Sequence, residues 1–372
     1  MDFVKAYHLS QFIDTFALGH YARVLEAQDL QTGQTVAFKV LRPEHVDYGD
    51  EPRWEYRAFA NEVELLATLT DVPQAVDLLD CGYISAGEEA PQGGEIISFR
   101  LDTLGFEQAM REMAAQGWRP YITMPALPRN QNLFYVMRSN QAAVRWRLPS
   151  EEGLSLALQF GHLLEQAHRR GIVYLDHKLE HVYWDGNRLI VIDFNSSRKL
   201  NGGVADPQSF RMDIHNLCVG ILYSVFTGLS PQKTAIRPQP GSAADVEARY
   251  QDITSLDFGM EPDLSKALQQ LLQRGAAQDI GHIDDFLYEL RDVAARHGWD
   301  FPHHYTSADS REAREQMQAG LRRLRIAHAS LREARDLFRD AAVLPDITDD
   351  LEAELRRLVR AINEMLNHRV IP

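Results

Sequence analysis

Two aspartates and a lysine near the middle of the chain have the types and spacing that phosphoryl transfer requires. Asp176 and Lys178 lie on a segment that follows Gly171, and Asp193 closes the aliphatic run Leu189–Ile192 after a turn. A carboxylate at the mouth of a buried strand pair is costly without a partner, and a magnesium ion bridging phosphate oxygens is a natural one. The pattern therefore indicates one acid that faces an attacking hydroxyl and a second that holds a metal ion.

Patterned segments upstream of these residues predict the elements that must position them. Residues 16–41 are expected to form two or three strands with a turn at Gln31–Gln34, and the last strand carries Lys39. Apolar periodicity over Trp54–Leu69 predicts an amphipathic helix that carries Glu62. A further strand is expected over Ala75–Tyr83.

The segment around Asp176 and Asp193 resembles the catalytic loop and the metal loop of eukaryotic-type protein kinases, H-R-D-x-K-x-x-N and D-F-G. The resemblance implies that Asp176 orients the substrate hydroxyl and accepts its proton. It implies that Lys178 neutralises the transferring phosphoryl group and that Asp193 holds Mg²⁺ with ATP.

The same family pattern assigns the nucleotide-binding residues. Lys39 is expected over the α and β phosphates, paired with Glu62, and Gly19 matches the middle glycine of the phosphate-covering loop. The strand Pro120–Leu127 resembles the hinge, with Met124 as gatekeeper. Adenine is expected to contact the backbone of Pro125, Ala126 and Leu127. Pro125 has no N–H to donate.

Three departures from the family pattern bear on activity. His181 replaces the asparagine that holds a second metal, and an imidazole nitrogen suits Mn better than Mg; a neutral core histidine is the alternative. Asn195 replaces the glycine of D-F-G. Leu175 replaces the arginine before the catalytic acid, which makes this a non-RD pattern without activation by loop phosphorylation.

The segment between Asp193 and Asp213 is short and lacks an A-P-E motif. Asp213 begins a stretch that resembles the kinase helix whose buried acid braces the catalytic loop. His168, near the end of a helix expected over Leu154–Arg170, is interpreted as a packing residue. The usual platform for a peptide substrate is therefore expected to be mostly absent.

We expect an α+β chain with a bilobal protein kinase-like fold and a C-terminal α-helical hairpin. The expected parts are a β-rich N-lobe at 1–127 with an insertion at 85–119, a helical C-lobe at 128–304 and the hairpin at 305–372. The C-lobe closes with helices over Leu264–Arg274, with Gly275 as a stop signal, and Ile283–His297. Heptad-like spacing in the tail predicts that the hairpin either docks on the C-lobe or pairs with another copy, as a homodimer.

Composition excludes several other classes. The chain of 372 residues has 53 acidic against 39 basic residues and a formal charge of −14, which opposes binding along a nucleic-acid backbone. No stretch approaches the ~18 uninterrupted apolar residues of a membrane helix, and the first residues lack the basic start of a signal peptide. We therefore expect a cytoplasmic protein with no nucleic-acid or membrane partner.

The leading interpretation is an ATP-dependent phosphotransferase, most like a Ser/Thr protein kinase, with ATP and Mg or Mn as cofactors and an unknown protein substrate. A pseudokinase that works as a scaffold and binds nucleotide weakly or not at all is the first alternative. A small-molecule kinase is the second, because the peptide platform is mostly missing.

Overall fold

The computed structural model describes residues 1–13, 21–46, 53–137, 147–200, 207–231, 248–262, 264–296 and 330–367, with isolated positions between 316 and 327. The expected phosphate-loop residue Gly19 lies outside this part of the chain, as does most of the first tail helix.

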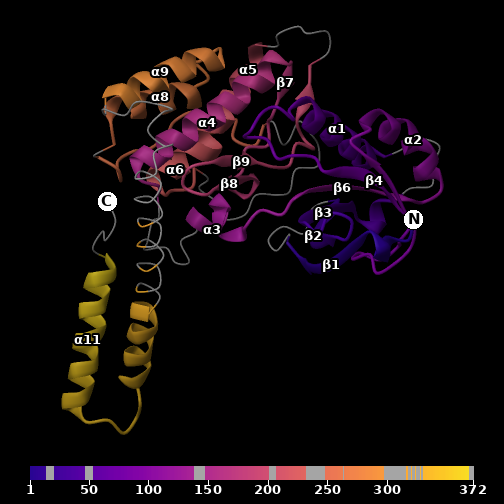
Figure 1. The fold of residues 1–372 in the computed structure, drawn as a ribbon. Helices are drawn as coiled ribbons and strands as arrows, with labels where there is room; N and C mark the ends of the chain where they lie inside the picture. Colours follow the sequence, from indigo (N-terminus) through magenta and orange to yellow (C-terminus); the bar gives the residue numbers. More distant parts are fainter. Residues whose placement is uncertain are drawn as a thin grey trace.

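The N-terminal part is built on a six-stranded antiparallel sheet with the order β1-β2-β3-β6-β4-β5 (Figure 1). A short helix η1 (Phe3–Lys5) precedes the sheet, and η2 (Pro43–His45) and α1 (Trp54–Thr68) follow its third strand. The strands are β1 (Tyr7–Phe12), β2 (Ala22–Asp29), β3 (Thr35–Leu41), β4 (Asp80–Ile84), β5 (Ile96–Arg100) and β6 (Arg119–Pro125).

The sheet differs from the sequence-based expectation at two places. It begins at Tyr7 rather than after Phe16, because β1 pairs with β2 through the register Tyr7 with Asp29. The strand expected from Ala75 begins only at Asp80. Residues 74–76 instead bond to Val191 in the other lobe: Val76 N donates to the Val191 carbonyl and Val191 N to that of Gln74.

The insertion at 85–119 folds onto the sheet and against α1. It supplies β5, which pairs with β4, and α2 (Thr103–Ala115), which carries buried Phe106 and Met110. Tyr83 stacks on Phe106 and donates to its carbonyl oxygen. Tyr56 of α1 donates to the carbonyl oxygen of Trp118. The insertion therefore packs against the helix that carries Glu62.

The C-terminal lobe is mainly helical, with two small two-stranded sheets at the boundary between the lobes (Figure 1). Its apolar core is continuous with the core beneath α1, so the lobes are packed together. Its helices are η3 (Arg129–Gln131), α3 (Leu133–Met137), α4 (Ser150–Arg169), η4 (Leu179–His181), α5 (Pro207–Asn216), the π-helical η6 (Leu217–Leu222), α6 (Tyr223–Thr227), α8 (Lys266–Ala276) and α9 (Ile283–Arg296). Its strands are β7 (Ile172–Val173), β8 (Val182–Trp184), β9 (Leu189–Val191) and β10 (Arg198–Lys199).

The expected closing helices are present as α8 and α9, but Gly275 is not the stop between them. It lies inside α8, which continues to Ala276. A side chain at this position would collide with Cys218 of η6. Glycine is used here because α8 and η6 pack closely.

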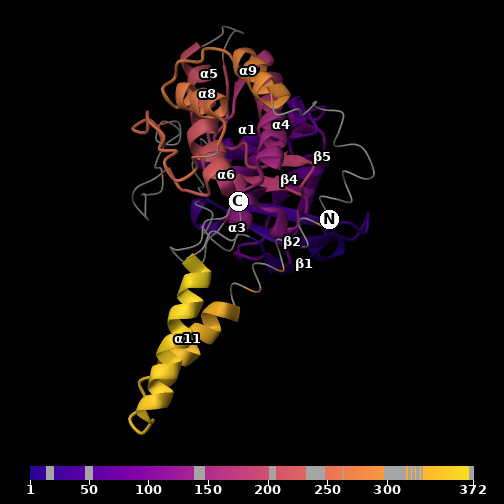
Figure 2. The same cartoon turned by 90° about the vertical axis from the view of Figure 1, so that its left-hand side faces the viewer.

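The described part of the tail consists of a helical segment at 330–341 and α11 (Asp349–Asn367). These helices lie side by side and project away from both lobes (Figures 1 and 2). Docking of the tail on the C-lobe and pairing with another copy both stay predictions. Within the described residues, no helix is both long enough and apolar enough to cross a bilayer.

Candidate active site

The loop that carries Asp176 is held by a buried acid in α5. Asp213 accepts hydrogen bonds from the backbone N–H of Tyr174 at 2.8 Å and of Leu175 at 2.7 Å. His168 contacts the same carboxylate through Nε2 at 3.0 Å. Leu175 has a φ of +66°, a strained conformation for a residue with a side chain, and these bonds compensate for it. The predicted bracing contact of Asp213 is confirmed.

Burial raises the pKa of the Asp213 carboxyl, but the hydrogen bond from His168 and the neighbouring histidines outweigh it, so the net pKa is lowered. His168 also stacks on Phe210. Its role is to support the carboxylate that holds the loop, in agreement with its interpretation as a packing residue.

Lys39, which is buried, joins Glu62 and Asp193 in one ion network. Its Nζ lies 2.7 Å from Oε2 of Glu62 and 2.8 Å from Oδ1 of Asp193. Burial lowers the pKa of Lys39, but the two carboxylates outweigh it and the net pKa is raised. The pKa of Asp193 is lowered because Lys39 and His181 overcome the effect of its burial. The predicted pairing of Lys39 with Glu62 is confirmed.

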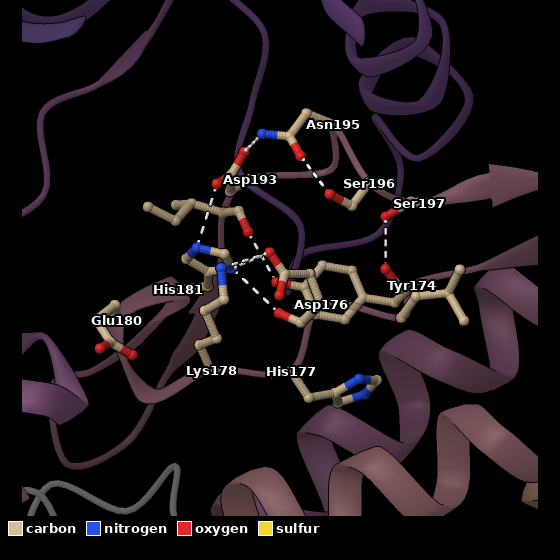
Figure 3. A network of polar contacts seen from close by, with 12 residues as sticks. Tyr174, Asp176, His177, Lys178, Glu180, His181, Asp193, Asn195, Ser196 and Ser197 are labelled. Carbon is tan, nitrogen blue, oxygen red and sulfur yellow. Dashed lines mark hydrogen bonds and ion pairs between the residues drawn. The ribbon is translucent and has the colours of Figure 1, made fainter. Parts of the chain in front are cut away.

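Asn195, which replaces the glycine of the D-F-G pattern, hydrogen-bonds to Asp193. The backbone of Asp193 has a φ of +64°, and the side-chain amide of Asn195 donates to its Oδ1 (Figure 3). Asn195 in turn accepts a hydrogen bond from Ser196. This departure from D-F-G therefore orients the acid rather than disturbing it.

Helix α1 also reaches the segment after Asp193. Nδ2 of Asn61 donates to the carbonyl oxygen of Asn195 at 3.2 Å and to that of Ser197 at 2.7 Å. The helix that supplies Glu62 thus also fixes the backbone that follows Asp193.

Asp176 is buried and has a cation on each carboxylate oxygen. Lys178 Nζ lies 2.8 Å from Oδ2, and Arg249 Nη2 lies 2.9 Å from Oδ1. Burial raises the pKa of Asp176, but His181, Lys178 and Arg249 outweigh it, so the net pKa is lowered. The acid is therefore held as a carboxylate, which is the form that accepts a hydrogen bond from a hydroxyl.

His181 lies between the two acids because the turn η4 brings it back beneath Asp176. Its Nδ1 lies 3.1 Å from the carbonyl oxygen of Asp176, and its Nε2 lies 3.2 Å from Oδ2 of Asp193 (Figure 3). One ligand atom from each of Asp176, His181 and Asp193 fits within 4.8 Å of the others. The structure thus brings together Asp193 and His181, which the sequence predicts as metal ligands, and places the expected catalytic acid Asp176 beside them.

The expected adenine-contacting residues lie at the end of β6, next to the strand that carries Lys39. Lys39 pairs with Ile122 and Ala37 with Met124 in the register of β3 with β6. Met124 is buried, and Ala126 and Leu127 are half-buried directly after the strand. The contact of this segment with adenine stays a prediction.

Three contacts of the site were not identified from the sequence. Arg249 reaches Asp176 from a distant segment that resembles no motif, so no local signal marked it. Asn61 occupies an ordinary position on an amphipathic helix. Asn195 was noted only as a missing glycine, although a side chain able to donate two residues after an acid was a usable signal.

Comparisons with known proteins give a likeness of fold. No family model matches the chain, and no curated protein matches it. Among solved structures it is similar to the kinase PK-1 of Cydia pomonella granulovirus, with 15% sequence identity and a TM-score of 0.50. That match covers 77% of this chain and 94% of PK-1. The chain therefore has an α+β, kinase-like bilobal fold.

Proposed function

We propose that this protein is an ATP-dependent phosphotransferase, most like a Ser/Thr protein kinase of the non-RD type. The observation that carries the proposal is the convergence of Lys39, Asp176 and Asp193, which come from three separate elements, on one site between the lobes. Phosphoryl transfer depends mainly on positioning and on neutralising charge. Two lysines and two carboxylates held by buried hydrogen bonds supply both.

The residues perform distinct tasks in this proposal. Lys39, held by Glu62, binds the α and β phosphates, and the end of β6 with Met124, Ala126 and Leu127 binds adenine. Asp176 orients the substrate hydroxyl and accepts its proton, while Lys178 neutralises the phosphoryl group. Gly19 remains the proposed residue of the phosphate-covering loop.

The donor set around His181 fits a divalent cation. A carbonyl oxygen only accepts hydrogen bonds, so the contact with the Asp176 carbonyl requires a proton on Nδ1. In the neutral ring, Nε2 then presents a lone pair beside the Asp193 carboxylate, an arrangement that a cation satisfies. We assign Asp193 and His181 as ligands of Mg or Mn, with Mn preferred; the ion would neutralise charge on the ATP phosphates.

A pseudokinase scaffold that binds nucleotide weakly or not at all is the second candidate, and one observation favours it. Lys39 and Asn195 both contact Oδ1 of Asp193, and cations contact both oxygens of Asp176. The chain's own residues therefore balance the charges of the two acids without a nucleotide or a metal ion.

A thermal-shift series separates these candidates. Unfolding is followed with ATP alone, with ATP and Mg²⁺, and with ATP and Mn²⁺; a ligand at 100 times its dissociation constant stabilises by about 2.7 kcal/mol. The phosphotransferase is supported by a metal-dependent shift together with transfer of labelled phosphate that Asp176→Ala abolishes. Absence of any shift would support the scaffold.

We also propose a substrate and an assembly for this protein. A protein hydroxyl is the proposed substrate, with a small molecule as the alternative, and the labelled-phosphate assay distinguishes the two by the size of the product. We also propose pairing of two copies through the C-terminal helices and a cytoplasmic location.

A further inference from the structure

The guanidinium of Arg249 is the least expected part of the site. It contacts Oδ1 of Asp176 at 2.9 Å, while Lys178 contacts Oδ2. The arginine side chain is 15% exposed and the carboxylate 4% exposed. A carboxylate oxygen can accept more than one hydrogen bond, but with a cation on each oxygen and so little of the side chain exposed, a substrate hydroxyl competes with the two cations for the acid.

The backbone next to Arg249 is fixed by hydrogen bonds and packing. The next residue, Tyr250, is buried and donates from its hydroxyl to the carbonyl oxygen of His177 at 2.9 Å. Its own carbonyl oxygen accepts from Nε2 of His215 at 2.9 Å. Any side chain at Gly220 of η6 would collide with the Tyr250 ring and with the His177 carbonyl. The backbone that carries Arg249 is therefore packed against the catalytic loop itself.

The two cations differ in how easily they can leave. Lys178 has a flexible side chain and is 23% exposed. Its ammonium group is a point charge that can pair with a phosphate group as well as with the Asp176 carboxylate. Arg249 presents a planar, preorganised fork from an anchored backbone. Under the proposed function, bound nucleotide draws Lys178 toward the phosphoryl group and frees Oδ2, whereas Arg249 stays on Oδ1.

We propose that Arg249 is a positioning residue that holds the Asp176 carboxylate in a fixed orientation. The segment 248–253 thereby supplies a permanent cation beside the catalytic acid. The arginine that precedes this acid in the H-R-D pattern is replaced by Leu175 in this chain. The acid is then oriented without a phosphorylated activation segment. This inference rests on the proposed function for its kinetic consequence but not for the contact itself.

The kinetic test compares Arg249→Ala and Arg249→Lys with the full-length chain. Loss of orientation at the reacting atoms costs about 100-fold in rate, so we expect kcat of Arg249→Ala to fall on that order with KM for ATP unchanged. Added guanidinium ion restores part of the rate in Arg249→Ala, and Arg249→Lys is intermediate. Arg274→Ala, which removes an ion-paired arginine of α8, serves as the matched control and keeps the full rate.

Several results overturn the proposal. A higher kcat in Arg249→Ala shows that the contact of Arg249 with Asp176 inhibits the reaction. An unchanged kcat shows that the contact does not position the acid. A loss that appears only in KM for ATP, without rescue by guanidinium, assigns Arg249 to nucleotide binding.

A second test needs no catalytic activity. Thermal unfolding of Arg249→Met, Asp176→Asn and the double variant forms a mutant cycle. We expect Arg249→Met to lower the melting temperature clearly in the native background and much less when Asp176 is already Asn. Additive effects contradict the contact. Coupling in a protein that transfers no phosphate leaves the contact valid and rejects only the proposed function.

Discussion

Nδ2 of Asn61 in α1 lies 2.7 Å from the carbonyl oxygen of Ser197, beyond the acid Asp193. The same Nδ2 atom donates to the carbonyl oxygen of Asn195 on this segment. The next residue of α1 is Glu62, the partner of Lys39. One helix thus determines both the position of the lysine and the path of the backbone that carries the proposed metal ligand.

Replacing Asn61 with Ala is expected to weaken binding of Mn²⁺–ATP. A hydrogen bond of this kind contributes about 1 kcal/mol, so loss of the tether corresponds to roughly fivefold weaker binding in isothermal titration calorimetry. The half-buried Thr68 at the end of α1, whose hydroxyl bonds only within its own helix, provides a control as Thr68→Ala, with unchanged affinity. Equal affinities for Asn61→Ala and the native protein would show that the tether does not position Asp193.

Replacing His181 with Asn is expected to change the metal preference. An amide oxygen suits Mg²⁺, whereas the imidazole nitrogen favours Mn²⁺. We expect Mn²⁺ affinity, measured by titration in the presence of ATP, to fall about tenfold while Mg²⁺ affinity is kept or improved. Identical metal titrations for the two proteins would identify His181 as a core histidine without a ligand role.

Replacing Lys39 with Met leaves the buried carboxylate of Glu62 and the half-buried carboxylate of Asp193 without their shared cation. Breaking a buried ion pair from one side costs about 3–5 kcal/mol, which chemical denaturation measures as a lower midpoint. The double variant Lys39→Met with Glu62→Gln removes one of the two charges and is expected to recover part of the loss. No recovery in the double variant would mean that Glu62 is not balanced by Lys39.

Replacing Asp213 with Asn leaves one of the two backbone N–H groups of the catalytic loop without a carboxylate oxygen. We expect a loss of about 1–3 kcal/mol at neutral pH. Asp71→Asn, which removes an exposed partner of Arg170, is the control, and surface pairs of this kind contribute about 0–1 kcal/mol.

The stability difference for Asp213→Asn has a defined pH dependence. The pKa of Asp213 in the folded protein lies below its ordinary value of 3.8. Its stabilising effect is therefore fully present above that value and is lost as the pH falls through the folded pKa. The gap between the variant and the native protein, followed by denaturant titration, should narrow below about pH 4. A constant gap would exclude ionised Asp213 as the source of the stabilisation.

Removing residues 305–372 is expected to convert a dimer into a monomer without unfolding the lobes. The described tail helices project from the body and expose apolar side chains such as Leu337 and Leu351. Light scattering gives the mass, and the melting temperature of the shortened chain should stay close to that of the full chain. A monomeric full-length protein would contradict pairing through this hairpin.

Local patterns were sufficient for most elements. The apolar period of α1, the alternation in β3 and the aliphatic run before Asp193 reflect which face of each element is buried, and burial is encoded residue by residue. Element ends were less predictable. Gly275 resembles a stop signal, but its role depends on the close approach of Cys218 from another helix, which sequence spacing does not reveal.

The identities of Lys39, Glu62, Asp176 and Asp193 were available from the chain alone, because each occurs in a short pattern whose chemistry is recognisable. Only the folded molecule revealed that Arg249 faces Asp176, that Asn61 holds the backbone after Asp193, and that His181 lies between both acids. Such contacts join segments far apart in the chain, and their geometry is set by packing between elements. Side-chain type specifies what a residue is able to do, whereas the packed fold determines which residue it acts upon.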